Sequence, residues 1–290
     1  RARRRRTPCD EVRRAGMTAT QSTAVESSSH QEWVAAVSAG LIGVVYWTFW
    51  VDPAILNPTY VDWLLVDPDR GVNYFGWALF RDTPWLMPLG LNPRYGLELS
   101  SSIVYSDSIP LLAIPFKALG GLLPRPFQYL GLWTLGCAIL QGVFGYLLAR
   151  RLGAGIAAAL VVSAFCVAAP VLVARSNHLA LTAHWTLLAA FYLYFGRATR
   201  LMPWVALLAV VAAIHPYLYA MVLAVFCADL LRRHRLQSAP AARLFGDGIL
   251  AVLVSVAVMW AIGVFVGASP GAGGFGYFKH DLLGLVDAGR

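Results

Sequence analysis

The sequence predicts an all-α fold, a polytopic bundle of helices that crosses a membrane several times. Two observations support this class. Hydrophobic residues make up 58% of the 290-residue chain and charged residues only 13%, whereas a soluble domain carries about a quarter charged residues. The hydrophobic residues are also concentrated in long runs, and about 20 apolar residues suffice to span a bilayer as a helix.

The first 32 residues form a polar segment of their own. The chain has a formal net charge of +8, and seven of its arginines lie before Met17. Basic residues beside a membrane span usually set its topology or meet anionic lipid. We therefore expect residues 1–32 to be a disordered cytoplasmic tail, with no nucleic-acid partner, and residues 33–290 to form the membrane domain.

Six long apolar runs follow the tail. They cover residues 33–51, 128–149, 155–174, 180–196, 203–231 and 246–267. The run 203–231 is too long for one crossing, and His215-Pro216 interrupts it. Pro216 has no backbone N–H to donate, and the polar side chain of His215 is unfavourable in hydrocarbon. Two short helices, 203–214 and 216–231, are predicted to meet there, which gives about seven transmembrane helices.

The segment 109–123 decides the topology. It contains two prolines, two glycines and Lys117, and it is short for a membrane span. If it crossed, Arg150 and Arg151 would fall outside; if it lies in the interface, every arginine cluster falls inside, as the positive-inside rule requires. We expect the second arrangement, in a bacterial cytoplasmic (inner) membrane with the N-terminus in the cytoplasm. Residues 52–127 then form a long extracytoplasmic loop.

The outer loop opens with a turn and a helix. Asp67-Pro68-Asp69-Arg70-Gly71 has turn composition, and Val72, Phe75 and Leu79 then recur at helical spacing. These patterns predict an amphipathic helix over 70–81 that lies on the bilayer. Asp69 has two candidate roles, as a cap on that helix or as a catalytic carboxylate. Asn73 would lie beside it, one turn further on.

A second acid precedes the next interfacial helix. Asp107 lies in the sequence Ser-Asp-Ser-Ile-Pro, just before 109–123. This is an ordinary helix start, in which Asp107 or Ser108 would cap the helix and the proline would occupy its first turn. Asp107 is therefore a second candidate for either a cap or a catalytic group.

The order of these elements resembles the opening module of the GT-C glycosyltransferases. That module has one span, a long outer loop with an early acid and two interfacial helices, then a span that ends here in A-R-R-L-G. Within this superfamily, the stretch from Phe75 to Ala113 is similar to a bacterial membrane family known as domain-of-unknown-function family 6311. Later segments that fit the same pattern are F-Q-Y-L-G-L-W, H-L-A-L-T-A-H-W, I-H-P-Y and G-F-G-Y-F. Because GT-C proteins are usually longer, we expect C-terminal spans or an outer domain to be missing.

The resemblance implies a glycosyltransferase reaction. Its donor would be a sugar carried on a polyprenyl phosphate in the membrane lipid, and its acceptor a glycan, lipid or protein outside the membrane. The early loop acid of the superfamily falls on Asp69, with Asp67 as a rival, and the later acid falls on Asp107. No cofactor is implied. A divalent cation held by Asp69 and Asp107 stays open as an alternative.

The residues themselves offer the groups that such a transfer needs. A carboxylate must take the proton of the acceptor hydroxyl, and cations or N–H groups must hold the departing phosphate. Asp69 and Asp107 are the candidate bases. The candidate substrate-binding groups are Asn73, Lys117, Arg175, His178, His184, His215 and Tyr217. Each histidine has a simpler alternative as an interfacial or helix-ending residue, and Arg175 as a side chain that reaches out of the hydrocarbon.

Two other classes of function compete with the enzyme. One is a transporter or flippase for lipid-linked sugars, which would favour ionisable residues inside several spans and internal repeats; only Asp229 fits. The other is a non-catalytic lipid-binding scaffold on the same fold. No phosphate loop ending in Gly-Lys-Ser/Thr is present.

Overall fold

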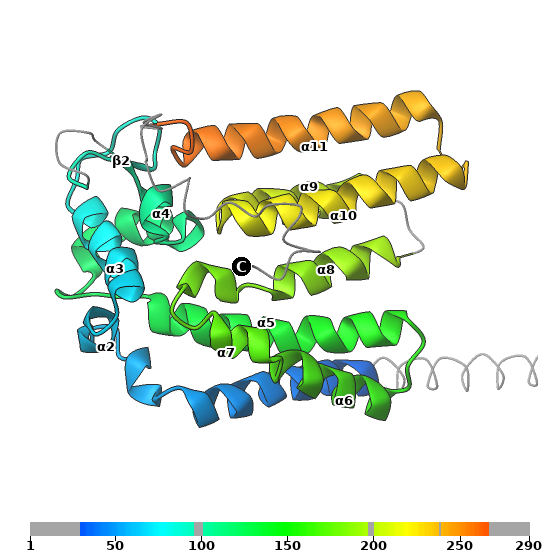
Figure 1. Cartoon of the computed structure of the whole chain (residues 1–290), viewed down its shortest axis with the longest axis horizontal. Helices are drawn as coiled ribbons and strands as arrows, with labels where there is room; N and C mark the ends of the chain where they lie inside the picture. The colour runs from blue at the N-terminus through cyan, green and yellow to red at the C-terminus, as the bar shows by residue number, and fades with distance from the viewer. Residues whose placement is uncertain (1–29, 96–100, 197–199, 238, 267–290) are drawn as a thin grey trace, which may run out of the picture.

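The computed structural model describes residues 30–95, 101–196, 200–237 and 239–266. Within these ranges the chain is all-α except for one pair of two-residue strands (Figure 1). Of the tail predicted at 1–32, only residues 30–32 fall inside the described ranges, and they already belong to the first helix. The G-F-G-Y-F segment lies outside them.

The helices vary widely in length. In chain order they are the first helix (His30–Trp50), α2 (Asp62–Leu65), α3 (Pro68–Arg81), α4 (Pro110–Ala118), α5 (Leu130–Arg151), α6 (Ile156–Val167), α7 (Pro170–Ala174), α8 (Trp185–Tyr194), α9 (Leu201–Ala212), α10 (Pro216–Arg235) and α11 (Ala241–Ala261). Short 3-10 helices are η1 (Pro53–Leu56), η3 (Ile103–Ser106), η4 (Gly120–Leu122) and η5 (Leu179–Thr182). Strands β1 (Leu91–Asn92) and β2 (Ser101–Ser102) pair antiparallel, with Leu91 opposite Ser102.

Four helical segments of the described chain are long and apolar enough to cross a membrane. They are His30–Trp50, Leu130–Arg151, Ile156–Ala174, which combines α6 and α7, and Ala241–Ala261. The chain is therefore a multi-pass membrane protein, but the prediction of seven such spans is wrong. A helix of 12 residues such as α9 rises only about 18 Å, against a hydrocarbon core of about 30 Å.

The helices predicted from sequence breaks are present. The pattern over 70–81 corresponds to α3, and the interrupted run 203–231 forms α9 and α10, which meet at His215. Pro216 begins α10, where its missing N–H has no partner to lose. The segment 109–123 forms α4 and η4 and contains no long span.

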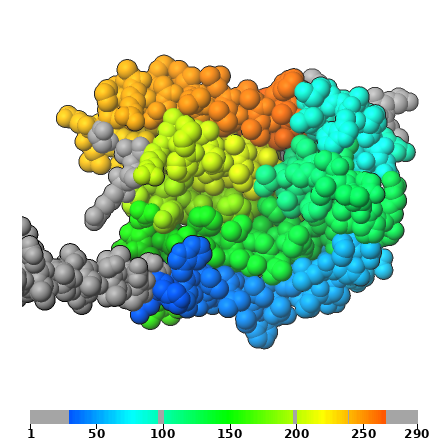
Figure 2. Space-filling model, turned by 180° about the vertical axis from the view of Figure 1, so that it is seen from behind, coloured from blue at the N-terminus to red at the C-terminus, as the bar shows by residue number. Residues whose placement is uncertain are grey.

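The ends of the helices are sorted onto two sides of the molecule. At one side, which we call the loop end, segment 52–127 gathers over the bundle (Figures 1 and 2). Three hydrogen bonds fix it there: Leu111 N–H donates to Ala213 O (2.8 Å), Tyr105 OH to Val264 O (2.6 Å) and Gln128 Nε2 to Ile55 O (2.7 Å).

At the other side, which we call the arginine end, cationic side chains cluster. Arg150 forms an ion pair with Glu32 of the first helix. Arg151 lies over the ring of Tyr192 at 4.2 Å, and Arg232 lies over the ring of Tyr194 at 4.9 Å. The first helix and α11 occupy opposite edges of the bundle (Figures 1 and 2).

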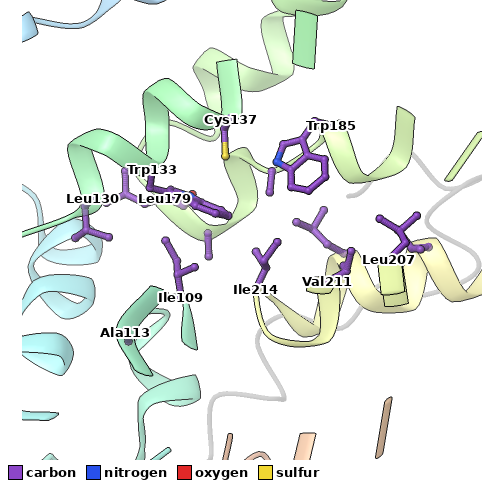
Figure 3. Close-up of a cluster of buried hydrophobic side chains, with 14 of the residues drawn as sticks. Ile109, Ala113, Leu130, Trp133, Cys137, Leu179, Trp185, Leu207, Val211 and Ile214 are labelled. Carbon is purple, nitrogen blue, oxygen red and sulfur yellow. The ribbon is translucent and has the colours of Figure 1, made fainter. Parts of the chain in front are cut away.

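One hydrophobic core runs from the bundle into the loop end. Figure 3 shows Ile109 and Ala113 at the start of α4 near Leu130 and Trp133 of α5. Trp77 of α3 extends the core: it is fully buried, its Nε1 donates to Phe127 O (2.9 Å), and its ring meets that of Tyr129 at 5.1 Å. The outer helices α3 and α4 are therefore packed against the bundle as part of its core.

A buried polar network lies at the arginine end. The carboxylate of Asp229 in α10 is 1% exposed and accepts from Trp204 Nε1 of α9 (3.0 Å) and from Arg232 Nη2 (2.6 Å). It also pairs with Arg233 Nη2 at 2.5 Å. Because buried charges must be paired, this arrangement gives Asp229 a structural role, although it was the one acid in the predicted spans.

Candidate functional site

The first acidic position is the start of α3. Asp67 is the N-cap of this helix, and its Oδ1 accepts from the backbone N–H groups of Asp69 (3.0 Å) and Arg70 (3.3 Å). The cap predicted as one role for Asp69 is therefore made by Asp67, its rival. Proline at the next position favours this geometry, because the capping residue before it is pushed into the extended region. The Asp69 carboxylate, 54% exposed, is left available.

We expect the replacement Asp67→Ala to lower the stability of the protein by about 1 kcal/mol, the usual effect of removing a helix cap. Activity should be retained, because the Asp69 side chain keeps its place in the first turn of α3. Thermal unfolding in detergent would check the stability, with Asp67→Asn as the control that keeps the cap. A stable but inactive Asp67→Ala protein would instead favour Asp67 as the reactive acid.

The second acidic position is the turn before α4. Asp107 has φ 50° and Ile109 has φ 52°, so both adopt the left-handed region that non-glycine residues rarely occupy. The N-cap of α4 is Ile109, which makes no side-chain cap, so neither Asp107 nor Ser108 has the predicted capping role. Backbone strain of this kind is retained where surrounding contacts enforce it, and it is frequent at functional sites.

Hydrogen bonds tie this turn to α3. Ser108 Oγ donates to Asn73 O (2.6 Å), and Asn73 Nδ2 donates to Asp69 O (2.7 Å). Tyr129 OH donates to Ser108 O from the bundle side. A Cβ on Gly76 would lie only 2.0 Å from Ser106 Oγ, so the turn can approach α3 closely only where the helix has a glycine. Asn73, predicted to contact substrate, is buried and has a positioning role here.

Two histidines of the bundle face the two acids. His178 Nε2, in the turn after α7, lies 3.5 Å from Asp69 Oδ2, and His215 Nε2, at the α9–α10 break, lies 3.5 Å from Asp107 Oδ1. We call these four residues the Asp–His cluster. The partners in each pair are more than 100 positions apart in the sequence. The structure thus brings together four of the predicted site residues.

The four groups form one electrostatic unit. Burial raises the pKa of Asp107, and the charges of His215 and His178 oppose that shift, while the charge of Asp69 adds to it. A charge at either pair therefore acts on the other. Asp107 is the more buried carboxylate, and its raised pKa brings it closer to neutral pH than an exposed aspartate.

His215 is held in one tautomer. Its Nδ1 accepts a hydrogen bond from Tyr217 N–H (3.1 Å), which leaves the imidazole proton on Nε2, the atom that faces Asp107. Burial lowers the pKa of His215 and so favours the neutral ring, while the charge of Asp107 opposes that shift. His215 therefore caps the start of α10 and presents an N–H group to the cluster, and it also lies just after the end of α9, the simpler role predicted for it. The Tyr217 ring lies 4.9 Å from it and is largely exposed.

Three other predicted residues lie in different surroundings. Arg175 is exposed at the end of α7, and its charge adds to the effect of burial, which lowers the pKa of His184. Lys117 is buried away from the cluster: Nζ donates to Thr83 Oγ1 (2.8 Å) and lies 3.9 Å from the centre of the Phe80 ring. Burial lowers the pKa of Lys117 to about 8.

A metal ion would need more ligands than the two acids. Among the described residues, no group of three or more His, Cys, Asp or Glu side chains is arranged to hold one. The histidines approach the acids as pairs, which is the geometry of proton exchange and charge compensation between side chains.

The chain matches the family described as "Domain of unknown function (DUF6311)" over residues 40–290. It belongs to the DUF6311 family. No curated protein matches this chain, and no solved structure matches it. The matched range contains both the loop end and the bundle, and so contains every residue of the Asp–His cluster.

One polar contact of this DUF6311 protein was missed by the sequence analysis. Arg70, read as part of a turn, donates from Nη2 to Asn177 Oδ1 (2.7 Å) and so links α3 to the turn that carries His178. Its position next to Asp69 was the available signal. The contact holds α3 against the His178 turn, and so helps to keep Asp69 and His178 close without involving either side chain.

Proposed function

We propose that this chain is a membrane glycosyltransferase that uses a sugar linked to a polyprenyl phosphate. The acceptor would be a glycan, lipid or protein hydroxyl on the extracytoplasmic side of a bacterial cytoplasmic membrane. One observation carries the proposal: two acids from the outer loop and two histidines from the bundle converge at the loop end. This agrees with the implied roles of Asp69 and Asp107.

The distribution of arginines supports the orientation. Arg150, Arg151 and Arg232 all lie at the arginine end, and positive residues favour the cytoplasmic side. These arginines share one end of the bundle whether or not the short helices cross the bilayer. The Asp–His cluster then faces the extracytoplasmic side, where lipid-linked donors present their sugars.

The proposed reaction is a single displacement at the sugar. The acceptor oxygen forms a bond to the anomeric carbon while the bond from that carbon to the phosphate oxygen breaks. The electron pair leaves with the polyprenyl phosphate, and the acceptor proton passes to a carboxylate. Asp107 suits the base, because its raised pKa favours proton uptake. Arg175, at the end of α7, and His178, in the turn that follows, suit the phosphate.

The test is the pool of lipid-linked sugars in cells that produce the full-length protein. We expect the wild-type chain to consume a polyprenyl-phosphate sugar, and Asp69→Asn and Asp107→Asn to let it accumulate. Asp82→Asn is the matched control, because Asp82 lies in the same loop but pairs with Arg125 at the surface (2.8 Å). Unchanged pools in both site variants would favour the lipid-binding scaffold.

The pH dependence of transfer should follow Asp107. A base must be ionised, so activity falls as pH drops through its pKa, which burial raises above 3.8. At the low pH of this limb, a protonated His215 lowers the pKa of Asp107, so His215→Gln, which carries no charge, should move the acid limb to higher pH. Initial rates measured from about pH 4 to pH 8 would show the shift. A limb that moves to lower pH in His215→Gln would contradict the assignment of Asp107 as the base.

A further inference from the structure

A separate cavity lies between α3 and the end of the first helix. It measures about 340 Å³, the lower part of the range for small-molecule sites. Its walls come from the loop end of the first helix, from α3, and from α5, α7 and η5. Its aromatic and charged lining residues are Tyr46, Trp47, Trp50, Asp52, Trp63 and Arg70. We call it the aromatic cavity.

Two residues that line the aromatic cavity carry donors that lack acceptors. Trp63 Nε1 and Arg70 Nε are buried and have no hydrogen-bond partner within the described ranges. The two side chains are neighbours, since the Arg70 guanidinium lies 5.9 Å from the centre of the Trp63 ring. Buried N–H groups left without an acceptor are costly, so a ligand that brings anionic oxygens to this wall would be stabilised. A phosphate has the required charge and number of acceptors.

An opposite charge lines the same cavity. Asp52 uses Oδ1 to cap η1 through Ala54 N–H (2.9 Å). In the described part of the chain it forms no ion pair with Arg70, so the cavity holds a cation and an anion at separate places. The rings of Tyr46, Trp47 and Trp50 add faces that attract a cation. This charge pattern complements a zwitterion.

The rest of the cavity suits a lipid. Its lining is mostly apolar, and Trp50 is 64% exposed at the end of a membrane span, where aromatic residues mark the headgroup level. We propose that the aromatic cavity binds a zwitterionic phospholipid, with its phosphate at Arg70 and Trp63 and its ammonium group at Asp52. Arg70 also links α3 to the turn that carries His178, so this site adjoins the Asp–His cluster, but the proposal does not depend on transferase activity.

The experiment compares lipids bound to the full-length protein. Wild-type protein in nanodiscs with equal amounts of phosphatidylethanolamine and phosphatidylglycerol would be released into detergent and its retained lipids measured by native mass spectrometry. We expect phosphatidylethanolamine to be retained preferentially. Arg70→Gln should reduce retention about tenfold or more, the effect of losing one charge-assisted hydrogen bond. Asp52→Asn still caps η1, and it should retain lipid without the preference for the ammonium headgroup.

The control is Arg125→Gln, which removes a cation of the same loop that is 70% exposed and paired with Asp82. It should retain phosphatidylethanolamine as the wild type does. Equal losses in Arg125→Gln and Arg70→Gln would overturn the site, as would a wild-type preference for phosphatidylglycerol. An unchanged headgroup preference in Asp52→Asn would overturn the assigned orientation. Thermal unfolding of each variant shows whether a lost lipid merely reflects a lost fold.

Discussion

Replacing Asp107 with asparagine should lower the rate of the proposed sugar transfer by about 10²–10⁴-fold, the usual contribution of a positioned general base. The amide cannot accept the proton of the acceptor hydroxyl. The fold should be unaffected, because Asp107 has φ 50° and asparagine tolerates the left-handed region well. Transfer of radiolabelled sugar from the lipid-linked pool in isolated membranes would measure the rate.

A matched pair of variants separates chemistry from position. Ser108→Ala keeps the Asp107 carboxylate but removes the bond to Asn73 O, so it should reduce activity less than Asp107→Asn and lower the unfolding temperature more. If Asp107→Asn retained wild-type transfer while Ser108→Ala lost it, the turn would be structural and the base would lie elsewhere.

Replacing Asp229 with alanine should destabilise the protein by about 3–5 kcal/mol, the effect of breaking a buried ion pair by removing one partner. The change takes from Arg232 and Arg233 the carboxylate they share, and it leaves the Trp204 indole N–H without its acceptor. The loss should appear as a lower thermal unfolding midpoint in detergent, and as less folded protein in the membrane fraction.

The control for this effect is Asp82→Ala. Asp82 also pairs with an arginine, but the pair lies at the surface, where an ion pair contributes about 0–1 kcal/mol. We expect a clear ranking of the two variants, with Asp229→Ala much less stable. Similar midpoints would mean that solvent or lipid headgroups satisfy the network at the arginine end.

The sequence was a better guide to the helices and turns of the site than to the contacts between its residues. Proline and helical spacing were enough to place α3 and the break at His215, because both effects act within a few residues. They did not decide which aspartate caps α3. Asp67 and Asp69 have the same side chain, and only the backbone conformation shows that Asp67 faces the free N–H groups.

The pairing of acids with histidines could not be predicted. Asp69–His178 and Asp107–His215 join segments that are adjacent only after the loop has packed on the bundle. The span count failed for a related reason. An apolar run gives the amount of hydrophobic sequence but not where the helix within it stops, and α8 and α9 are shorter than a bilayer.

The bonds among Asn73, Ser108 and Tyr129 have a mechanical consequence. They join α3 to the Asp107 turn and, through Tyr129, to the bundle that carries His178 and His215, so the positions of the acids and of the histidines are coupled. In each pair the acid and the histidine lie 3.5 Å apart. Under the proposed function, a substrate that reaches both carboxylates would have to displace both histidines from their acids.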